Sequence, residues 1–302
     1  MVASWNENSE ITSFELLSLD STSKSCPILP DLPTTMIPMA GYLFNGTDPI
    51  ICGAVESPCS NPCYLLQKGN WSEISHLNNC RFFFSILSFN HQNKYNLITS
   101  GGTEDQEYFS TVEYFDGNKW TIDQNIKLPE GLASHCLVKL NNSLLMLIGG
   151  ENSKQNLTSR TWFLNTLSGN WSKGPDLITA RSWHSCNTMN WFNPRNSETE
   201  IVAGGYITGI DDITASVELL FLREYDLFQN GWVEGPVLPY VNAGSSLIKY
   251  ETGLIIVGGW IHRHIYQLST PKRPWVKMTQ LLKEPADYLA AFFIPDDVIM
   301  CH

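Results

Sequence analysis

A small-residue pair at the end of an apolar run recurs along this chain at nearly constant intervals. The second members of the pairs are Ala54, Gly102, Gly150, Gly205 and Gly259, with a glycine before each of them. Successive copies lie 48 to 55 positions apart. A period near fifty residues indicates a repeat protein, in which each unit packs mainly on its neighbours.

Each unit predicts four short strands. In the third unit these are 136–140, 144–148, which runs into Gly149-Gly150, then 161–164 and 170–173, with polar turns between them. The strands are rich in aromatic and β-branched residues, and no helical period competes. A tryptophan opens each predicted fourth strand, at Trp71, Trp120, Trp171, Trp232 and Trp275.

The order Gly-Gly, an aromatic residue on the third strand and a tryptophan on the fourth resembles the kelch repeat, over essentially the whole chain. Residues 180–184, Ala-Arg-Ser-Trp-His, also resemble the way that family leads into a first strand. The pattern is most similar to extracellular kelch proteins of invertebrates, whose first blades carry cysteines such as Cys52 and Cys63. The resemblance implies a β-propeller of four-stranded antiparallel blades.

The two chain ends predict how the ring closes. Residues 11–32 contain a predicted third and fourth strand, and residues 287–301 a predicted first and second strand. Together they form one blade, which removes the exposed edges of an open sheet. We therefore expect an all-β, six-bladed kelch-type propeller, with residues 1–302 as a single domain.

Composition restricts the partners. The chain has 19 basic and 30 acidic residues, a net charge of −11 and no basic run. This argues against nucleic acid, which is bound by clustered lysine and arginine. No run of about 18 apolar residues occurs, so we expect no membrane insertion. The expected protein is a monomer without a cofactor.

Eight cysteines and five glycosylation sequons favour an extracellular protein. We expect the pairs Cys52–Cys63, Cys59–Cys80 and Cys26–Cys301, although eight cysteines allow 105 connectivities. All five sequons lie in predicted turns, and they begin at Asn45, Asn70, Asn141, Asn156 and Asn170. The first residues do not resemble a signal peptide. Secretion after removal of a signal is the expectation, and a cytoplasmic protein is the alternative.

The predicted repeat places its loops on two faces. The turn face carries the connections between first and second strands and between third and fourth strands. The loop face carries the second-to-third connections and the segments between blades, and kelch propellers, which this chain resembles, usually bind partners there. Arginine, tryptophan and tyrosine are enriched in binding hot spots. The candidate binding residues are Arg81, Arg181, Trp183, Tyr206, Tyr240, Trp260, Arg263 and Tyr288; alternatively, they seal the mouth of the ring.

The sequons differ between the faces. Asn45, Asn70, Asn141 and Asn170 fall on the predicted turn face, and Asn156 alone belongs to the loop face. Because a glycan is bulky and well solvated, a bound partner would avoid it. The distribution agrees with binding on the loop face.

Catalytic patterns are weak. His262 and His264 are two histidines without the third ligand of a zinc site, so we expect no metal. His135 and His184 share one repeat position, which indicates a structural role, and no nucleophile elbow occurs.

The leading interpretation is a non-catalytic binding module for a protein or glycan. The alternative is a carbohydrate-active kelch-type enzyme, an oxidase or epimerase, with its site in the central channel and His135 and His184 as candidates. A cytosolic substrate-adaptor propeller is a third possibility, which the cysteines and sequons disfavour.

Overall fold

The structure is a computed structural model. The residues it describes are 2–6, 11–17, 19, 28–34, 36, 39–56, 59–91, 94–191, 199–208, 212–222, 231–251, 253–260, 262–285, 290–291 and 293–294. Their regular secondary structure consists of β-strands. No helix in this part of the chain could cross a membrane.

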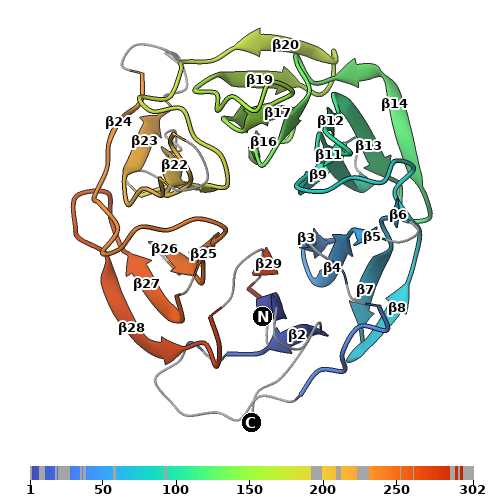
Figure 1. Ribbon diagram of the computed structural model, residues 1–302, viewed down its shortest axis with the longest axis horizontal. Coiled ribbons are helices and arrows are strands. Elements are labelled where there is room, and N and C mark those ends of the chain that lie inside the picture. Colours follow the sequence, from blue (N-terminus) through green and yellow to red (C-terminus); the bar gives the residue numbers. More distant parts are fainter. Residues whose placement is uncertain are drawn as a thin grey trace.

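Five four-stranded antiparallel sheets follow one another along the chain, with their strands in sequence order from the channel outwards (Figure 1). Sheet 1 contains β3 (Met39–Phe44), β4 (Asp48–Gly53), β7 (Cys63–Gln67) and β8 (Asn70–Glu73). Sheet 2 contains β9 (Ser85–His91), β10 (Lys94–Ser100), β13 (Thr111–Phe115) and β14 (Trp120–Lys127). Sheet 3 contains β16 (Cys136–Asn141), β17 (Leu144–Ile148), β19 (Thr161–Asn165) and β20 (Asn170–Lys173).

Sheets 4 and 5 continue the same order. Sheet 4 contains β21 (Ser185–Met189), β22 (Thr199–Ala203), β23 (Val217–Phe221) and β24 (Val233–Glu234). Sheet 5 contains β25 (Ser246–Tyr250), β26 (Gly253–Val257), β27 (His264–Leu268) and β28 (Val276–Leu281). Three two-stranded ribbons add β5 (Val55–Glu56) with β6 (Cys59–Ser60), β11 (Thr103–Glu104) with β12 (Glu107–Tyr108), and β15 (Leu132–Ala133) with β18 (Glu151–Asn152).

A three-stranded sheet 6 joins the two chain ends. Its order is β29 (Ala290–Ala291), β1 (Val2–Asn6) and β2 (Ile11–Glu15), with Val2 opposite Ala291 and Glu15 opposite Val2. The predicted first and third positions match β29 and β2, but the second position, which was assigned to the carboxyl terminus, is occupied by β1. A short hairpin lets β1 and β2 pair locally. Residues 25–27 and 295–301 lie outside the described residues.

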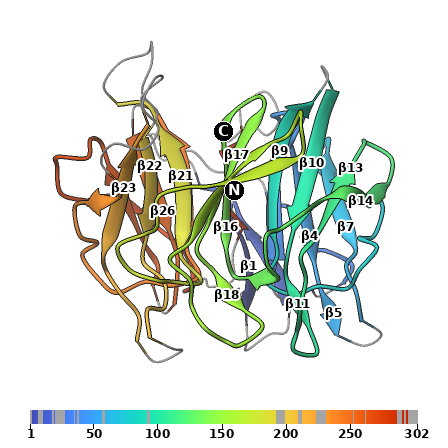
Figure 2. The same cartoon turned by 90° about the horizontal axis from the view of Figure 1, so that it is seen from above.

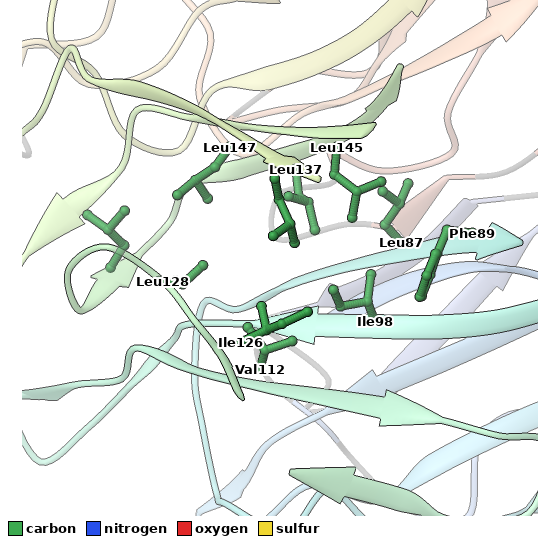
Figure 3. Packing of buried hydrophobic residues seen from close by; sticks show 11 residues of the cluster. Leu87, Phe89, Ile98, Val112, Ile126, Leu128, Leu137, Leu145 and Leu147 are labelled. Atoms are coloured by element: carbon green, nitrogen blue, oxygen red, sulfur yellow. The ribbon is translucent and has the colours of Figure 1, made fainter. Parts of the chain in front are cut away.

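Six apolar cores lie between neighbouring sheets, and each draws residues from two of them. Figure 3 shows the core between sheets 2 and 3, where Leu87 and Ile98 face Leu137 and Leu145. The innermost strands, β3, β9, β16, β21, β25 and β29, also contact one another in a closed cycle. The arrangement is a β-propeller, whose stability comes from faces that meet across sheets.

The repeated tryptophans supply these cores. Trp120, Trp232 and Trp275 are buried, and Trp71 and Trp171 are partly buried against a core. Two of the indoles also donate a hydrogen bond to the preceding unit, from Nε1 of Trp232 to the Pro175 carbonyl at 3.0 Å and from Nε1 of Trp275 to the Pro236 carbonyl at 2.8 Å. The five tryptophans therefore pack in the cores between sheets, as their predicted structural role requires.

The glycine pairs are required by close packing against the segments that lead into the sheets. Gly149 and Gly150 have φ of 56° and 106°, a left-handed backbone that favours glycine. A Cβ at Gly149 would lie 2.8 Å from Cε1 of His184, and one at Gly150 would lie 2.7 Å from Cβ of His135. Gly149 thus meets the segment that leads into sheet 4, and Gly150 meets the segment that leads into its own sheet. The sequence period records the places where these segments leave no room for a side chain.

Candidate functional site

The loop face is built where the segments between sheets meet the second-to-third loops. Phe82 pairs with Thr103, and Ser182 pairs with Tyr206, through isolated antiparallel bridges. Figure 2 shows β5, β11 and β18 together at the lower end of the molecule, which is the loop face. The hydroxyl of Tyr108 donates to Oε1 of Glu151 at 2.5 Å and so ties the loops of sheets 2 and 3 together.

A chain of backbone hydrogen bonds runs around part of the channel mouth. The N–H groups of Ser134, Trp183 and Gly244 donate in turn to the carbonyls of Phe83, Ser134 and Trp183, at 2.8, 3.0 and 2.9 Å. Phe83, Ser134 and Trp183 have left-handed φ of 58°, 52° and 57°. Such a backbone costs about 1–3 kcal/mol at a bulky residue and is a feature of functional sites. Here the hydrogen bonds hold it in place.

Five aromatic side chains form a row across this mouth, which we name the aromatic row. The centroid distances are 6.3 Å for Phe82–Phe83, 4.5 Å for Phe83–Trp183, 6.3 Å for Trp183–Tyr206 and 6.2 Å for Tyr206–Trp260. Trp260 is 43% exposed at one end of the row. The structure therefore brings three predicted residues, Trp183, Tyr206 and Trp260, into one group, which Phe82 and Phe83 complete.

Tyr240 and Arg263 lie in a separate group on sheet 5 and its connections. The Tyr240 ring stacks on His262 with centroids 3.7 Å apart and contacts Tyr266 at 5.3 Å. Burial raises the pKa of the Tyr240 hydroxyl. Nε of Arg263 donates to the Leu282 carbonyl at 2.8 Å, so this guanidinium is partly engaged within the fold. Tyr288 lies outside the described residues.

Arg81 and Arg181 do not lie on the surface, which corrects their predicted role as binding anchors. Both side chains are 0% exposed. Arg81 pairs with Glu113 at 2.7 Å, and Arg181 pairs with Glu218 at 2.5 Å. Burial lowers the pKa of both guanidinium groups, and the adjacent carboxylates oppose that shift. A cation buried in this way stabilises the sheet and cannot contact a ligand.

His135 and His184 are buried between units, as the predicted structural role requires. Burial, together with Arg81 near His135 and Arg181 near His184, lowers the pKa of each imidazole to about 3. Nε2 of His135 is 2.9 Å from Oγ of the buried Ser100. Both histidines are therefore neutral at ordinary pH and lie against glycines. Both line the central cavity, where the enzyme alternative placed them, but they are only 6% and 7% exposed.

Three disulfides are present among the described residues. They include both predicted local pairs, Cys52–Cys63 and Cys59–Cys80. The third, Cys136–Cys186, joins the inner strands of sheets 3 and 4, and the sequence analysis missed it because the two residues lie 50 positions apart. Cys26 and Cys301 lie outside the described residues.

Two groups of side chains contain possible metal ligands. Cys59, Cys80 and Glu104 have ligand atoms within 4.8 Å of one another, but both sulfurs are oxidised in a disulfide. His262 is stacked on Tyr240, while His264 contacts Tyr266 instead. A thiolate is needed for metal binding by cysteine, so the oxidised group lacks suitable donors.

All five sequon asparagines are exposed. Asn45 and Asn141 lie at turns between first and second strands, and Asn70 and Asn170 follow turns between third and fourth strands. Asn156 lies between β18 and β19, on the loop face. The predicted division of sequons between the faces matches these positions, and glycosylation itself stays a prediction.

The central channel contains a cavity of about 510 Å³. Strands β3, β9, β16, β21, β25 and β29 all contribute to its lining. Phe83 and Trp183 lie at its loop-face end, and Lys139 and Lys249 are nearer to its turn-face end. Its size falls within the range of small-molecule sites.

Comparison with known proteins supports the fold. No protein-family profile matches the chain, and no curated protein matches it. A solved structure of YjhT, a kelch-type β-propeller, is similar with a TM-score of 0.63 and 13% sequence identity, covering 83% of this chain and 86% of YjhT. At this identity the likeness concerns the fold alone. The chain is a β-propeller.

Proposed function

We propose that this protein is a six-bladed kelch-type propeller in which residues 1–302 form one domain. The six cores between neighbouring sheets and the closed cycle of inner strands support this count. Sheet 6, built from β29, β1 and β2, is the blade that closes the ring.

The function that we propose is non-catalytic binding of a protein or glycan through the aromatic row. The observation that carries this proposal is the contact series from Phe82 to Trp260, fixed at the mouth by backbone hydrogen bonds. Rigid aromatic side chains provide contact area at small entropic cost. The left-handed backbone at Phe83 and Trp183 lowers the stability of the fold. The proposed binding role accounts for this cost, because that backbone holds the two rings at the mouth of the channel.

Secretion and glycosylation belong to the same proposal. Three disulfides, six oxidised cysteines in all, are compatible with an oxidising compartment. Asn45, Asn70, Asn141 and Asn170 would carry glycans on the turn face and leave most of the loop face clear. Intact mass before and after glycosidase and reduction tests both points.

A matched pair of variants tests the binding surface. Trp260→Ala and Tyr206→Ala should each reduce capture of the partner at least about tenfold, because truncation of an aromatic hot spot costs about 2 kcal/mol or more. Leu167→Ala is the control, since Leu167 is 71% exposed outside the row, at the turn between β19 and β20. The assay is a pull-down from extracellular fluid beside a glycan array, with thermal melting of each variant. Undiminished binding by both row variants would refute the proposal.

A further inference from the structure

The central cavity has a charge pattern unlike that of the whole chain. The chain has 30 acidic and 19 basic residues. A proportionate share would place about three carboxylates among the 30 residues that line the cavity. Among the described residues, its lining contains no aspartate or glutamate, and its two ordinarily charged residues are Lys139 and Lys249. The cavity therefore carries a local positive charge inside an acidic protein.

The two lysines lie at one level of the channel. Lys139 is five residues after Ser134, and Lys249 is five residues after Gly244, and both starting residues belong to the hydrogen-bonded chain at the mouth. Lys139 is paired with Leu145, and Lys249 is paired with Leu254. Each of these leucines is the second residue of its strand, so both lysines lie close to the turn face. The lysines come from strands β16 and β25, which flank β21 on either side.

Neither ammonium group is neutralised within the described part of the chain. The ion pairs found there involve Glu73, Arg81, Arg160, Lys173 and Arg181 with their partners, and do not include Lys139 or Lys249. Lys139 is partly buried, and an ammonium group in such a partly enclosed site attracts an anion more strongly than one in open solvent, because the local dielectric is lower.

The remaining walls suit an organic molecule. The rings of Phe83 and Trp183 lie 4.5 Å apart at the loop-face end. Hydroxyl groups of Ser85 and Ser185 lie between the two ends, where Ser85 donates to the His135 carbonyl at 2.6 Å and Ser185 to the Ser245 carbonyl at 3.0 Å. Lys249 is exposed at the opposite end, so a ligand can reach the lysines from the turn face.

We propose that the central cavity binds a small carboxylate. Its charged end pairs with the ammonium groups of Lys139 and Lys249, and its body extends toward Phe83 and Trp183. This site shares Phe83 and Trp183 with the aromatic row, but it opens toward the turn face and recognises charge. One protein would then hold a small organic acid in its channel and a larger partner on its loop face.

Calorimetric titration tests the charge requirement. The probes are benzoate, gluconate and acetate, with benzamide as the neutral counterpart of benzoate and inorganic phosphate as a general anion. We expect at least one carboxylate to bind, with an affinity that falls as the salt concentration rises. Where benzoate binds, the affinity for benzamide should be lower by a factor of about ten or more. Absence of binding by all three carboxylates, or equal binding of benzamide and benzoate, would refute the proposal. Tighter binding of phosphate than of every carboxylate would also refute it.

Variants separate this site from the loop face. Lys139→Met and Lys249→Met should each weaken the carboxylate about tenfold, and the double variant should abolish measurable binding. Lys277→Met is the matched control, because Lys277 is exposed on the outermost strand β28. Trp260→Ala should leave carboxylate binding unchanged, and the double lysine variant should still capture the loop-face partner. Retained carboxylate affinity in a folded double variant would overturn the proposal.

Discussion

The buried pair Arg181–Glu218 gives the sharpest quantitative prediction. Nη1 of Arg181 donates to the Gly204 carbonyl at 2.8 Å and Nη2 donates to Oγ of Ser216 at 2.9 Å, in addition to the ion pair at 2.5 Å. Glu218 also accepts the N–H groups of Ile178 and Thr179 at 2.7 and 3.1 Å. The pair thus joins β23 to the segment that leads into sheet 4.

Sheet 3 has apolar residues at the positions that correspond to Arg181 and Glu218. Leu132 lies two residues before its left-handed residue Ser134, as Arg181 lies two residues before Trp183. Leu132 and Trp162 both pack in the apolar core between sheets 2 and 3. Trp162 is the second residue of β19, as Glu218 is the second residue of β23, so apolar residues in sheet 3 occupy the positions that the ion pair occupies in sheet 4.

Arg181→Leu should destabilise the protein by about 3–5 kcal/mol, because Glu218 would remain buried without its cation. The double variant Arg181→Leu/Glu218→Leu should lose only about 1–3 kcal/mol, since the freed N–H groups of Ile178 and Thr179 lie near the surface and can bind water. The double-mutant cycle should then give a coupling energy of about 2 kcal/mol or more.

Urea unfolding at neutral pH measures Arg181→Leu, Glu218→Leu and the double variant against the natural protein. The midpoint of the transition should fall in the stated order at a similar m-value. Arg81→Leu, in the matching pair with Glu113, should behave as Arg181→Leu does. A loss below about 0.5 kcal/mol for Arg181→Leu, or a double variant as unstable as the sum of the singles, would refute this reasoning.

Three further predictions concern folding. The pKa of His184 falls from 6.5 to about 3 on folding, so the unfolded state binds the proton first and stability is lost as pH falls below about 6.5. His184→Phe, which introduces the residue found at the matching position of sheet 2, Phe84, should make the melting temperature depend less on pH between pH 7 and 4. An unchanged pH dependence would contradict this prediction. Unreduced digestion should yield a linked Cys136–Cys186 peptide, and Cys136→Ser/Cys186→Ser should lower stability by about 2–4 kcal/mol; free thiols there would show that the bond is absent. Removal of residues 1–20 should unfold or aggregate the ring, because β1 and β2 form most of sheet 6; a monomer with unchanged melting would contradict the closure.

The repeat could be predicted from sequence because its signals are local. Each unit needs a small-residue pair where the segments leading into its own sheet and the next sheet approach closely, as at Gly149 and Gly150. It also needs an indole such as Trp232 to fill the core between sheets. These requirements recur about every fifty residues, so five copies made the β-propeller visible without a structure. The short-range disulfides followed in the same way, since Cys52 and Cys63 lie on paired strands.

Other features depended on contacts between units, which no single repeat encodes. Arg181 looks like a surface anchor until β23 places Glu218 beside it, and Phe83 gains its role only where its ring meets Trp183 from two sheets away. The order within sheet 6 depended on pairing between the chain ends, in which β1 lies between β2 and β29. The sequence alone determined the local period, and the tertiary structure decided which side chains that period buries, joins or presents, because those contacts cross from one sheet to another.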